Sequence, residues 1–256
     1  MVYFVSDVHL GYGERTQWQP REELFIALLD AIAPRAQTLF VVGDIFDYWF
    51  EYRRAIPREF FRTIAAFDRF RRRGANVEYI VGNHDFGHRD FFEQDLGITI
   101  HWSDVERTID GKRFYIAHGD GKVAGDRGYL LLRAVLRSKL ANAAYRWVHP
   151  DIGIGLAALS SKKSRHYSSV REYGTGDSLE EFARKKICDD GFDYVVMGHS
   201  HRSAYVEVAR GSRYGYYVNL GDWIGSTPLV GIFDGERFQL TDVCALVVSA
   251  RSEHDK

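Results

Sequence analysis

The residues best suited to chemistry in this chain lie in five short blocks, each of which follows an apolar run. Their side chains are carboxylates, an amide and imidazoles, which bind divalent cations and move protons. Two carboxylates, one amide oxygen and four imidazoles, with no thiolate among them, favour Mn, Fe or Zn. They suffice for two ions if one carboxylate bridges. The candidate ligands are Asp7, His9, Asp44, Asn83, His118, His199 and His201.

Two of these blocks carry their ligands two residues apart, as Asp7-Val8-His9 and His199-Ser200-His201. In extended backbone, residues i and i+2 point to the same side, so both members of each pair can reach one cavity. A lone histidine near a strand end is most often a satisfied polar residue. Five such blocks in one chain instead indicate a shared site.

The block Val81-Gly82-Asn83-His84-Asp85 supplies the two expected catalytic residues. Two metal ions about 3.5–4 Å apart form a clamp for in-line displacement at phosphorus by a metal-activated hydroxide. We predict that His84 protonates the leaving oxygen or stabilises the transition state. We predict that Asp85 orients the ring of His84.

Apolar runs alternate with helical patterns in the first third of the chain, which predicts parallel strands with crossover helices. In such sheets ligands bind at the carboxyl ends of the strands. The predicted helices run from Pro20 to about residue 31 and over 57–73. The predicted strands are 2–5, 38–42, 77–81, 98–102, 105–109, 113–117, 192–197, 204–208, 214–219, 229–233 and 237–241.

Residues 122–173 lack strand signals, and we expect them to form an inserted basic amphipathic helical lid within a single domain of residues 1–256. Between residues 127 and 171 there are nine lysines and arginines and one acid, Asp151, which gives +8 in a chain of net charge -1. Several leucines and a valine share one helical face. Basic and apolar residues together suit an anionic amphiphile or a membrane surface.

Bulk properties narrow the class of protein. The chain has 256 residues, 45% of them hydrophobic and 27% charged, which is ordinary globular composition. A net charge of -1 argues against a nucleic-acid partner. Cys188 and Cys244 form no CxxC and are expected to be reduced thiols of a cytoplasmic protein.

The N-terminus has no basic leader before its apolar run, so it does not indicate a secretory signal. No apolar span is long enough to cross a bilayer. We therefore expect a cytoplasmic protein, peripheral on the inner face of the cytoplasmic membrane.

The five blocks together resemble the signature blocks of calcineurin-like metallophosphoesterases, in the same order from Asp7 to His201. The resemblance implies an α/β (α+β) fold, a four-layer β-sandwich flanked by helices. It also implies two divalent metal ions, most often Mn, with Fe or Zn as alternatives. One ion would be held by Asp7, His9, Asp44 and His201. Asp44 would bridge to a second ion held by Asn83, His118 and His199.

A narrower resemblance is to UDP-2,3-diacylglucosamine hydrolases of lipid A biosynthesis. It is carried by Ser6-Asp7-Val8-His9-Leu10, by Gly43 to Trp49, by His118-Gly119-Asp120 with Asp126 and Tyr129, and by the basic insertion. It implies hydrolysis of the pyrophosphate of UDP-2,3-diacylglucosamine to 2,3-diacylglucosamine 1-phosphate and UMP, with inserted helices covering the acyl chains. The best-known branch of these hydrolases has arginine where this chain has His84.

The same resemblance implies a set of substrate contacts. For the basic run the alternative is a solvated helix end, and for Trp49 the alternative to lining an acyl pocket is core packing. His88 and His166 are weaker candidates, for contacts to the substrate or to the residues behind the metal ligands. The expected substrate-binding residues are Asn83, Asp126, Lys162, Lys163, Arg165 and Trp49.

Two other functions remain open from the sequence. One is a metallophosphoesterase of the same fold that acts on another phosphodiester or on a nucleotide. The other is a scaffold of this fold that binds a partner without catalysis. The scaffold is disfavoured because a competent residue fills every ligand position.

Overall fold

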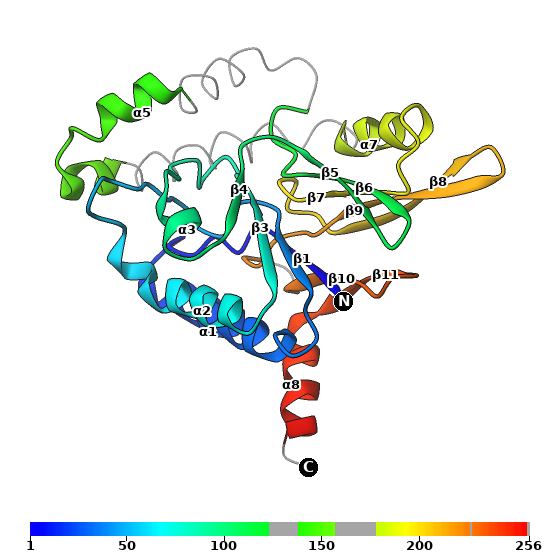
Figure 1. The fold of residues 1–256 in the computed structure, drawn as a ribbon, viewed down its shortest axis with the longest axis horizontal. Helices are drawn as coiled ribbons and strands as arrows, with labels where there is room; N and C mark the ends of the chain where they lie inside the picture. Colours follow the sequence, from blue (N-terminus) through cyan, green and yellow to red (C-terminus); the bar gives the residue numbers. More distant parts are fainter. Residues whose placement is uncertain (123–137, 157–177, 226, 255–256) are drawn as a thin grey trace.

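Two β-sheets form the centre of the molecule (Figure 1). The computed structural model describes residues 1–122, 138–156, 178–225 and 227–254. The first sheet has the order β11-β10-β1-β2-β3-β4 and the second β5-β6-β7-β9-β8. The strands are β1 (Val2–Val5), β2 (Thr38–Val41), β3 (Asn76–Ile80), β4 (Thr99–His101), β5 (Val105–Ile109), β6 (Lys112–Ala117), β7 (Tyr194–Met197), β8 (Ala204–Arg210), β9 (Arg213–Asn219), β10 (Leu229–Phe233) and β11 (Phe238–Asp242).

Helices cover the outer face of each sheet. α1, α2 and α8 lie on the first sheet, and α7 lies on the second (Figure 1). A further helix, α5, lies on the side of the molecule beyond the ends of β3 and β4 (Figure 1). The helices are α1 (Arg15–Ile32), the 3-10 turn η1 (Arg58–Phe60), α2 (Phe61–Arg72), α3 (Phe91–Gln94), α5 (Lys139–Tyr145), α7 (Ser178–Cys188) and α8 (Val243–His254).

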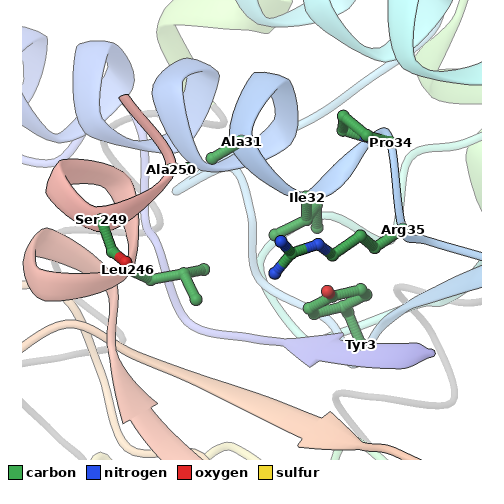
Figure 2. A pocket seen from close by; sticks show the side chains of 8 residues that line it. All are labelled: Tyr3, Ala31, Ile32, Pro34, Arg35, Leu246, Ser249 and Ala250. Atoms are coloured by element: carbon green, nitrogen blue, oxygen red, sulfur yellow. The ribbon is translucent and has the colours of Figure 1, made fainter. Parts of the chain in front are cut away.

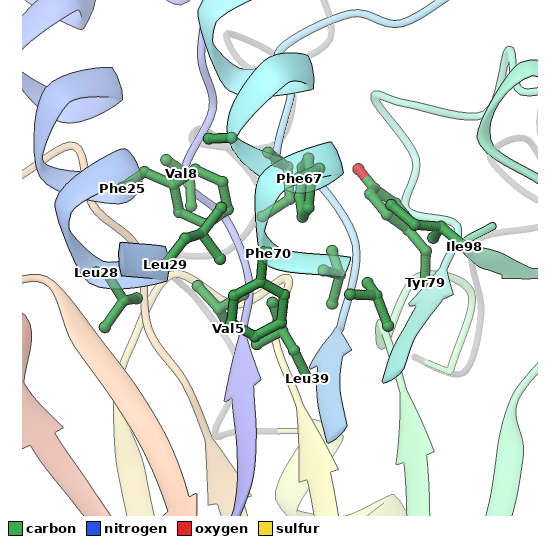
Figure 3. Packing of buried hydrophobic residues seen from close by; sticks show 14 of the residues in the cluster. Val5, Val8, Phe25, Leu28, Leu29, Leu39, Phe67, Phe70, Tyr79 and Ile98 are labelled. Carbon is green, nitrogen blue, oxygen red and sulfur yellow. The ribbon is translucent and has the colours of Figure 1, made fainter. Parts of the chain in front are cut away.

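Three hydrophobic cores separate these four layers. Phe25, Leu29 and Phe67 of the helices pack on the first sheet, as Figure 3 shows. A second core fills the space between the sheets, where Phe4 is stacked between Phe40 and Phe114 with ring centroids 5.2 and 5.8 Å away. A third core joins the second sheet to α7. The predicted four-layer sandwich is therefore confirmed.

Parallel pairing sets the direction of the key strands. β1 pairs in parallel with β2 and β2 with β3. In the second sheet β6 pairs in parallel with β7. All five strands thus deliver the residues that follow them to one edge of the sandwich.

The strands match their predicted ranges closely, whereas the first helix begins earlier than expected. α1 starts at Arg15 and contains Pro20 in its second turn. The chain before it is tied down because the backbone N–H of Glu14 donates to the side chain of Gln17, at 2.9 Å. This capping contact explains a start five residues before the proline. α8 was not predicted.

Only part of the expected lid lies within the described residues. Within this part, α5 and the stretch at 150–156 are helical, and the lid itself stays a prediction. Among the described residues, no helix combines the length and apolar character needed to cross a bilayer.

A shallow cavity of about 150 Å³ lies between α1, α8 and the start of β1 (Figure 2). Ile32 and Leu246 line it, with the ring of Tyr3 and the guanidinium of Arg35 beside them. It lies at the amino end of β1, whereas the candidate ligands follow the carboxyl end, so it is separate from the functional site.

The stacked phenylalanines between the sheets generate a stability prediction. Phe4→Ala removes a fully buried ring and should lower the free energy of unfolding by about 3–5 kcal/mol. Phe61→Ala is the matched control, since that ring is 69% exposed and its loss should cost less than about 0.5 kcal/mol. Urea unfolding measures both changes, and equal losses in the two variants would contradict this account of the core.

Candidate metal centre

Five strand ends bring the candidate ligands together. Asp7 and His9 follow β1, Asp44 follows β2, and the later ligands follow β3, β6 and β7. The backbone N–H of Asp7 donates to Gly43 O at 3.1 Å, which ties the first two ends. The backbone N–H of His199 donates to Asp7 Oδ2 at 3.0 Å, which ties one sheet to the other. The site therefore lies where the two sheets meet.

The first cluster consists of Asp7, His9 and His201. Asp7 Oδ1 lies 3.5 Å from His9 Nε2 and 3.6 Å from His201 Nε2. The two imidazole nitrogens are 3.3 Å apart. Three ligand atoms of the right type thus lie within 4.8 Å of one another, which makes these three residues a candidate metal-binding group.

The second cluster is centred on His118. Its Nε2 lies 2.9 Å from Asn83 Oδ1 and 3.2 Å from Asp44 Oδ2. The ring of His199 has its centroid 5.1 Å from that of His118. Ligand atoms of Asp7, Asp44 and His118 also lie within 4.8 Å of one another. The two clusters are therefore adjacent, with carboxylates between them.

The donor set fits divalent cations. Asp7 and Asp44 are fully buried, and the second oxygen of each accepts a backbone N–H, from His199 and His84 respectively. Asp7 Oδ1 and Asp44 Oδ2 accept no hydrogen bond from the described residues. Buried carboxylate oxygens without a donor are costly, and a cation satisfies them. Oxygen and imidazole ligands without sulfur suit Mn, Fe or Zn.

The electrostatics of the cluster show how its charges are balanced. Burial lowers the pKa of His118, but the Asp44 carboxylate beside it raises that pKa to about 10. Burial and the neighbouring His118 charge lower the pKa of His199 to about 3. A proton on His118 thus offsets the carboxylates, and a bound cation would displace that proton.

The backbone at five of the seven ligands is left-handed rather than extended. φ is 51° at Asp7 and at His9, and 55° at Asp44. It is 69° at His199 and 58° at His201. The side chains converge as expected, but the reason differs from the simple alternation of an extended strand. Such conformations cost about 1–3 kcal/mol each and concentrate at functional sites.

Glycines beside the ligands allow close packing on the carboxylates. A Cβ at Gly82 would lie 2.0 Å from Asp44 Oδ1, and one at Gly198 would lie 2.2 Å from Asp7 Oδ2. Neither glycine has a positive φ. The role of Gly82 and Gly198 is therefore close approach to the carboxylates rather than a left-handed backbone.

A second set of residues holds the imidazoles, and the sequence reasoning did not identify it. Asp222 Oδ2 lies 3.0 Å from His201 Nδ1, and Asp47 Oδ1 lies 3.6 Å from His9 Nδ1. The carbonyl of Val42 lies 2.9 Å from His118 Nδ1. The two shorter contacts orient the rings of His201 and His118, the Asp47 carboxylate lies beside His9, and Nε2 of each ring is left for a metal. The sequence signals that could have identified these partners are two carboxylates, in Gly43-Asp44-Ile45-Phe46-Asp47 and in Leu220-Gly221-Asp222.

His84 lies at the edge of this centre, and Asp85 lies beneath it. His84 Nδ1 is 3.1 Å from Asp47 O, and its ring is 5.1 Å from that of His9. Asp85 accepts hydrogen bonds from the backbone N–H groups of Gly82 and Ile45 and from the hydroxyl of Tyr79. These contacts assign the roles differently from the prediction that Asp85 orients the ring of His84. Asp47 orients that ring, and Asp85 orders the loop that carries His84.

The other predicted contacts have different outcomes. Trp49 is 1% exposed and packs on Phe46 and Phe92, so its contacts are those of core packing. His88 is buried beside Glu51, at 3.4 Å. Asp126, Lys162, Lys163, Arg165 and His166 lie outside the described residues.

Comparison with known proteins gives one family. The family model for calcineurin-like phosphoesterase matches residues 1–203. UDP-2,3-diacylglucosamine hydrolase from Porphyromonas gingivalis is 31% identical over 239 residues, 87% of this chain and 90% of that protein. The hydrolase of the same name from Haemophilus ducreyi is 26% identical, over 86% of this chain and 91% of that protein. A crystal structure of Vps29 with zinc from Entamoeba histolytica matches at 12% identity with a TM-score of 0.39, over 94% of this chain and 98% of that one.

The contact between Asp222 and His201 generates a metal-binding prediction. Asp222→Ala should weaken Mn²⁺ affinity by about 10–100-fold, because the His201 ring loses the carboxylate that orients it. Asp189→Ala is the control, since Asp189 is exposed on the loop after α7. Competition against a metal-sensitive dye measures both affinities. Unchanged affinity in Asp222→Ala, with the circular dichroism spectrum of the wild type, would refute this role.

Proposed function

Because the chain belongs to the calcineurin-like phosphoesterase family, and is thus a metal-dependent hydrolase, we propose that it cleaves the pyrophosphate bond of UDP-2,3-diacylglucosamine. The products would be 2,3-diacylglucosamine 1-phosphate and UMP. The observation that carries this proposal is the extent of similarity to hydrolases of that name. They align with 86–91% of this chain and with 90–91% of their own length.

The seven clustered ligands supply the metal centre of the proposed reaction. Asp7, His9 and His201 would hold one ion, Asn83, His118 and His199 the other, and Asp44 both. When bound, two divalent ions polarise the phosphoryl oxygens, activate water and neutralise developing charge. We propose Mn²⁺ as the resident metal, in keeping with the oxygen and imidazole donors.

His84 is the group we assign to the leaving oxygen. Its Nδ1 donates to the carbonyl of Asp47, which leaves Nε2 as the nitrogen through which the protonated ring would give a proton to the oxygen on which negative charge develops. The Asp47 carboxylate, 3.9 Å from the same Nδ1, helps to orient the ring. Asp85 supports this step indirectly by fixing the loop that carries His84.

We propose that the basic insertion, residues 122–173, forms a lid that binds the apolar end of the substrate. Its described part exposes Leu140, Trp147, Ile152 and Leu156. Phosphates at one end of the substrate and acyl chains at the other match a segment that is both basic and apolar. We propose that Asn83, Asp126, Lys162, Lys163 and Arg165 contact the glucosamine phosphate.

Turnover of the proposed substrate is the direct test. Purified protein with Mn²⁺ should release UMP from UDP-2,3-diacylglucosamine and hydrolyse bis(p-nitrophenyl) phosphate poorly. Asp44→Ala should reduce turnover by at least about 10³-fold, because it removes the ligand shared by both ions. Asp189→Ala should keep wild-type activity. Efficient use of the aryl ester without release of UMP would instead favour a phosphodiesterase with another substrate.

We further propose that the protein works at the inner face of the cytoplasmic membrane, held there peripherally. Trp147 is 88% exposed and Leu140 is 84% exposed, on a segment of high positive charge. Exposed tryptophan and leucine beside basic residues are typical of surfaces that insert into the lipid interface.

Vesicle binding tests this location. Trp147→Ser should weaken sedimentation with vesicles containing anionic phosphatidylglycerol by about fivefold or more, because the indole would no longer enter the interface. Trp102→Ser is the matched control, since Trp102 is also exposed, at 45%, but lies after β4. Equal binding by the two variants would contradict the proposed membrane face.

A further inference from the structure

Residues 138–156, called here the α5 segment, have an inner face that is tied to the body of the protein. Arg146 Nε donates to the backbone carbonyl of Glu51 at 2.8 Å, and its guanidinium lies 5.2 Å above the ring of Phe50. The ring of Tyr145 packs edge-on against the same Phe50, with centroids 4.7 Å apart. The α5 segment therefore contacts residues 50 and 51 through two consecutive side chains.

A glycine completes this contact. The hydroxyl of Tyr145 donates to Gly153 O at 2.6 Å, which links α5 to the helical stretch at 150–156. Gly153 is buried, and a Cβ on it would lie 1.8 Å from the hydroxyl of Tyr52. Tyr52 itself packs on Phe50, with ring centroids 5.3 Å apart. Only a residue without a side chain allows this approach.

The surface that receives the α5 segment is itself bonded to the loop that follows His84. Glu51 Oε2 accepts the backbone N–H groups of Arg89, Asp90 and Phe91 at 2.8–3.1 Å. The backbone of Glu51 donates to Gly87 O at 2.9 Å. Although burial raises the pKa of Glu51, the neighbouring His88, the indole N–H of Trp49 and the backbone N–H of Phe91 lower it to about 2, so the carboxylate is charged at neutral pH.

From these contacts we propose that Tyr145, Arg146 and Gly153 form a clamp that fixes the α5 segment relative to the metal centre and so positions the acyl end of the substrate. This inference rests on the proposed function. The clamp residues are positioning residues, because they contact Phe50 to Tyr52 rather than the reacting atoms. The contacts of Glu51 with the His84 loop use its side chain and its backbone N–H, whereas Arg146 binds its carbonyl. Opening the clamp should therefore cost acyl binding more than phosphoryl chemistry.

Gly153→Ala tests the clamp, and Gly155→Ala is its matched control. Both glycines lie in the same helical stretch and gain the same helix propensity on substitution, but a Cβ at Gly155 meets nothing within 4 Å. Hydrogen exchange of amides 139–156 should become about tenfold faster in Gly153→Ala and stay within about twofold of wild type in Gly155→Ala. Arg146→Met should also speed the exchange, without a steric clash, and Arg213→Met is its control because Arg213 is exposed at the start of β9.

Kinetics separate positioning from a general structural role. In Gly153→Ala the KM for UDP-2,3-diacylglucosamine should rise about tenfold, while kcat/KM for bis(p-nitrophenyl) phosphate should change less than about twofold. Equal losses on both substrates, or exchange rates equal to those of Gly155→Ala, would overturn the clamp. If the wild type releases no UMP, the proposed function fails, and the exchange comparison still decides whether the clamp exists.

Discussion

Two buried carboxylates, Asp7 and Asp44, constrain how the residues around them are arranged. Each has one oxygen bonded to a backbone N–H and one that accepts no hydrogen bond from the described residues. Uncompensated buried charge is among the most costly features a protein can contain. The imidazoles around these oxygens compensate part of that charge, and a divalent cation held by them would compensate the rest. The centre is therefore a place where stability is given up for function.

The arrangement of the two sheets brings the candidate ligands together. Parallel pairing of β1, β2 and β3 in one sheet, and of β6 and β7 in the other, delivers all seven ligands to one edge. Stacked aromatic rings around Phe4 fix the distance between the sheets. Left-handed backbone at five ligands then turns their side chains inward. Since the packed sheets hold those residues firmly, the local strain persists.

Much of this could be predicted from the sequence, because strand runs and ligand blocks are local patterns. The strand ranges, the four layers and the family follow from them. The partners of the imidazoles could not be predicted. Asp222 reaches His201 from a loop 21 residues later, and Asp47 reaches His84 from another strand end. Sequence spacing also gave the wrong reason for the convergence of Asp7 and His9, since φ > 0 is set by tertiary packing. Trp49 could not be assigned to the core rather than to a pocket without its neighbours.

We propose that the edge shared by the two sheets holds two divalent ions, with Asp44 as a ligand of both. A crystal grown with Mn²⁺ and measured on both sides of the manganese absorption edge tests this proposal. It should show two anomalous peaks about 3.5–4 Å apart, both in contact with the Asp44 carboxylate. A single ion, or no ion at the strand ends with Asp7 and Asp44 contacted only by protein groups, would contradict it.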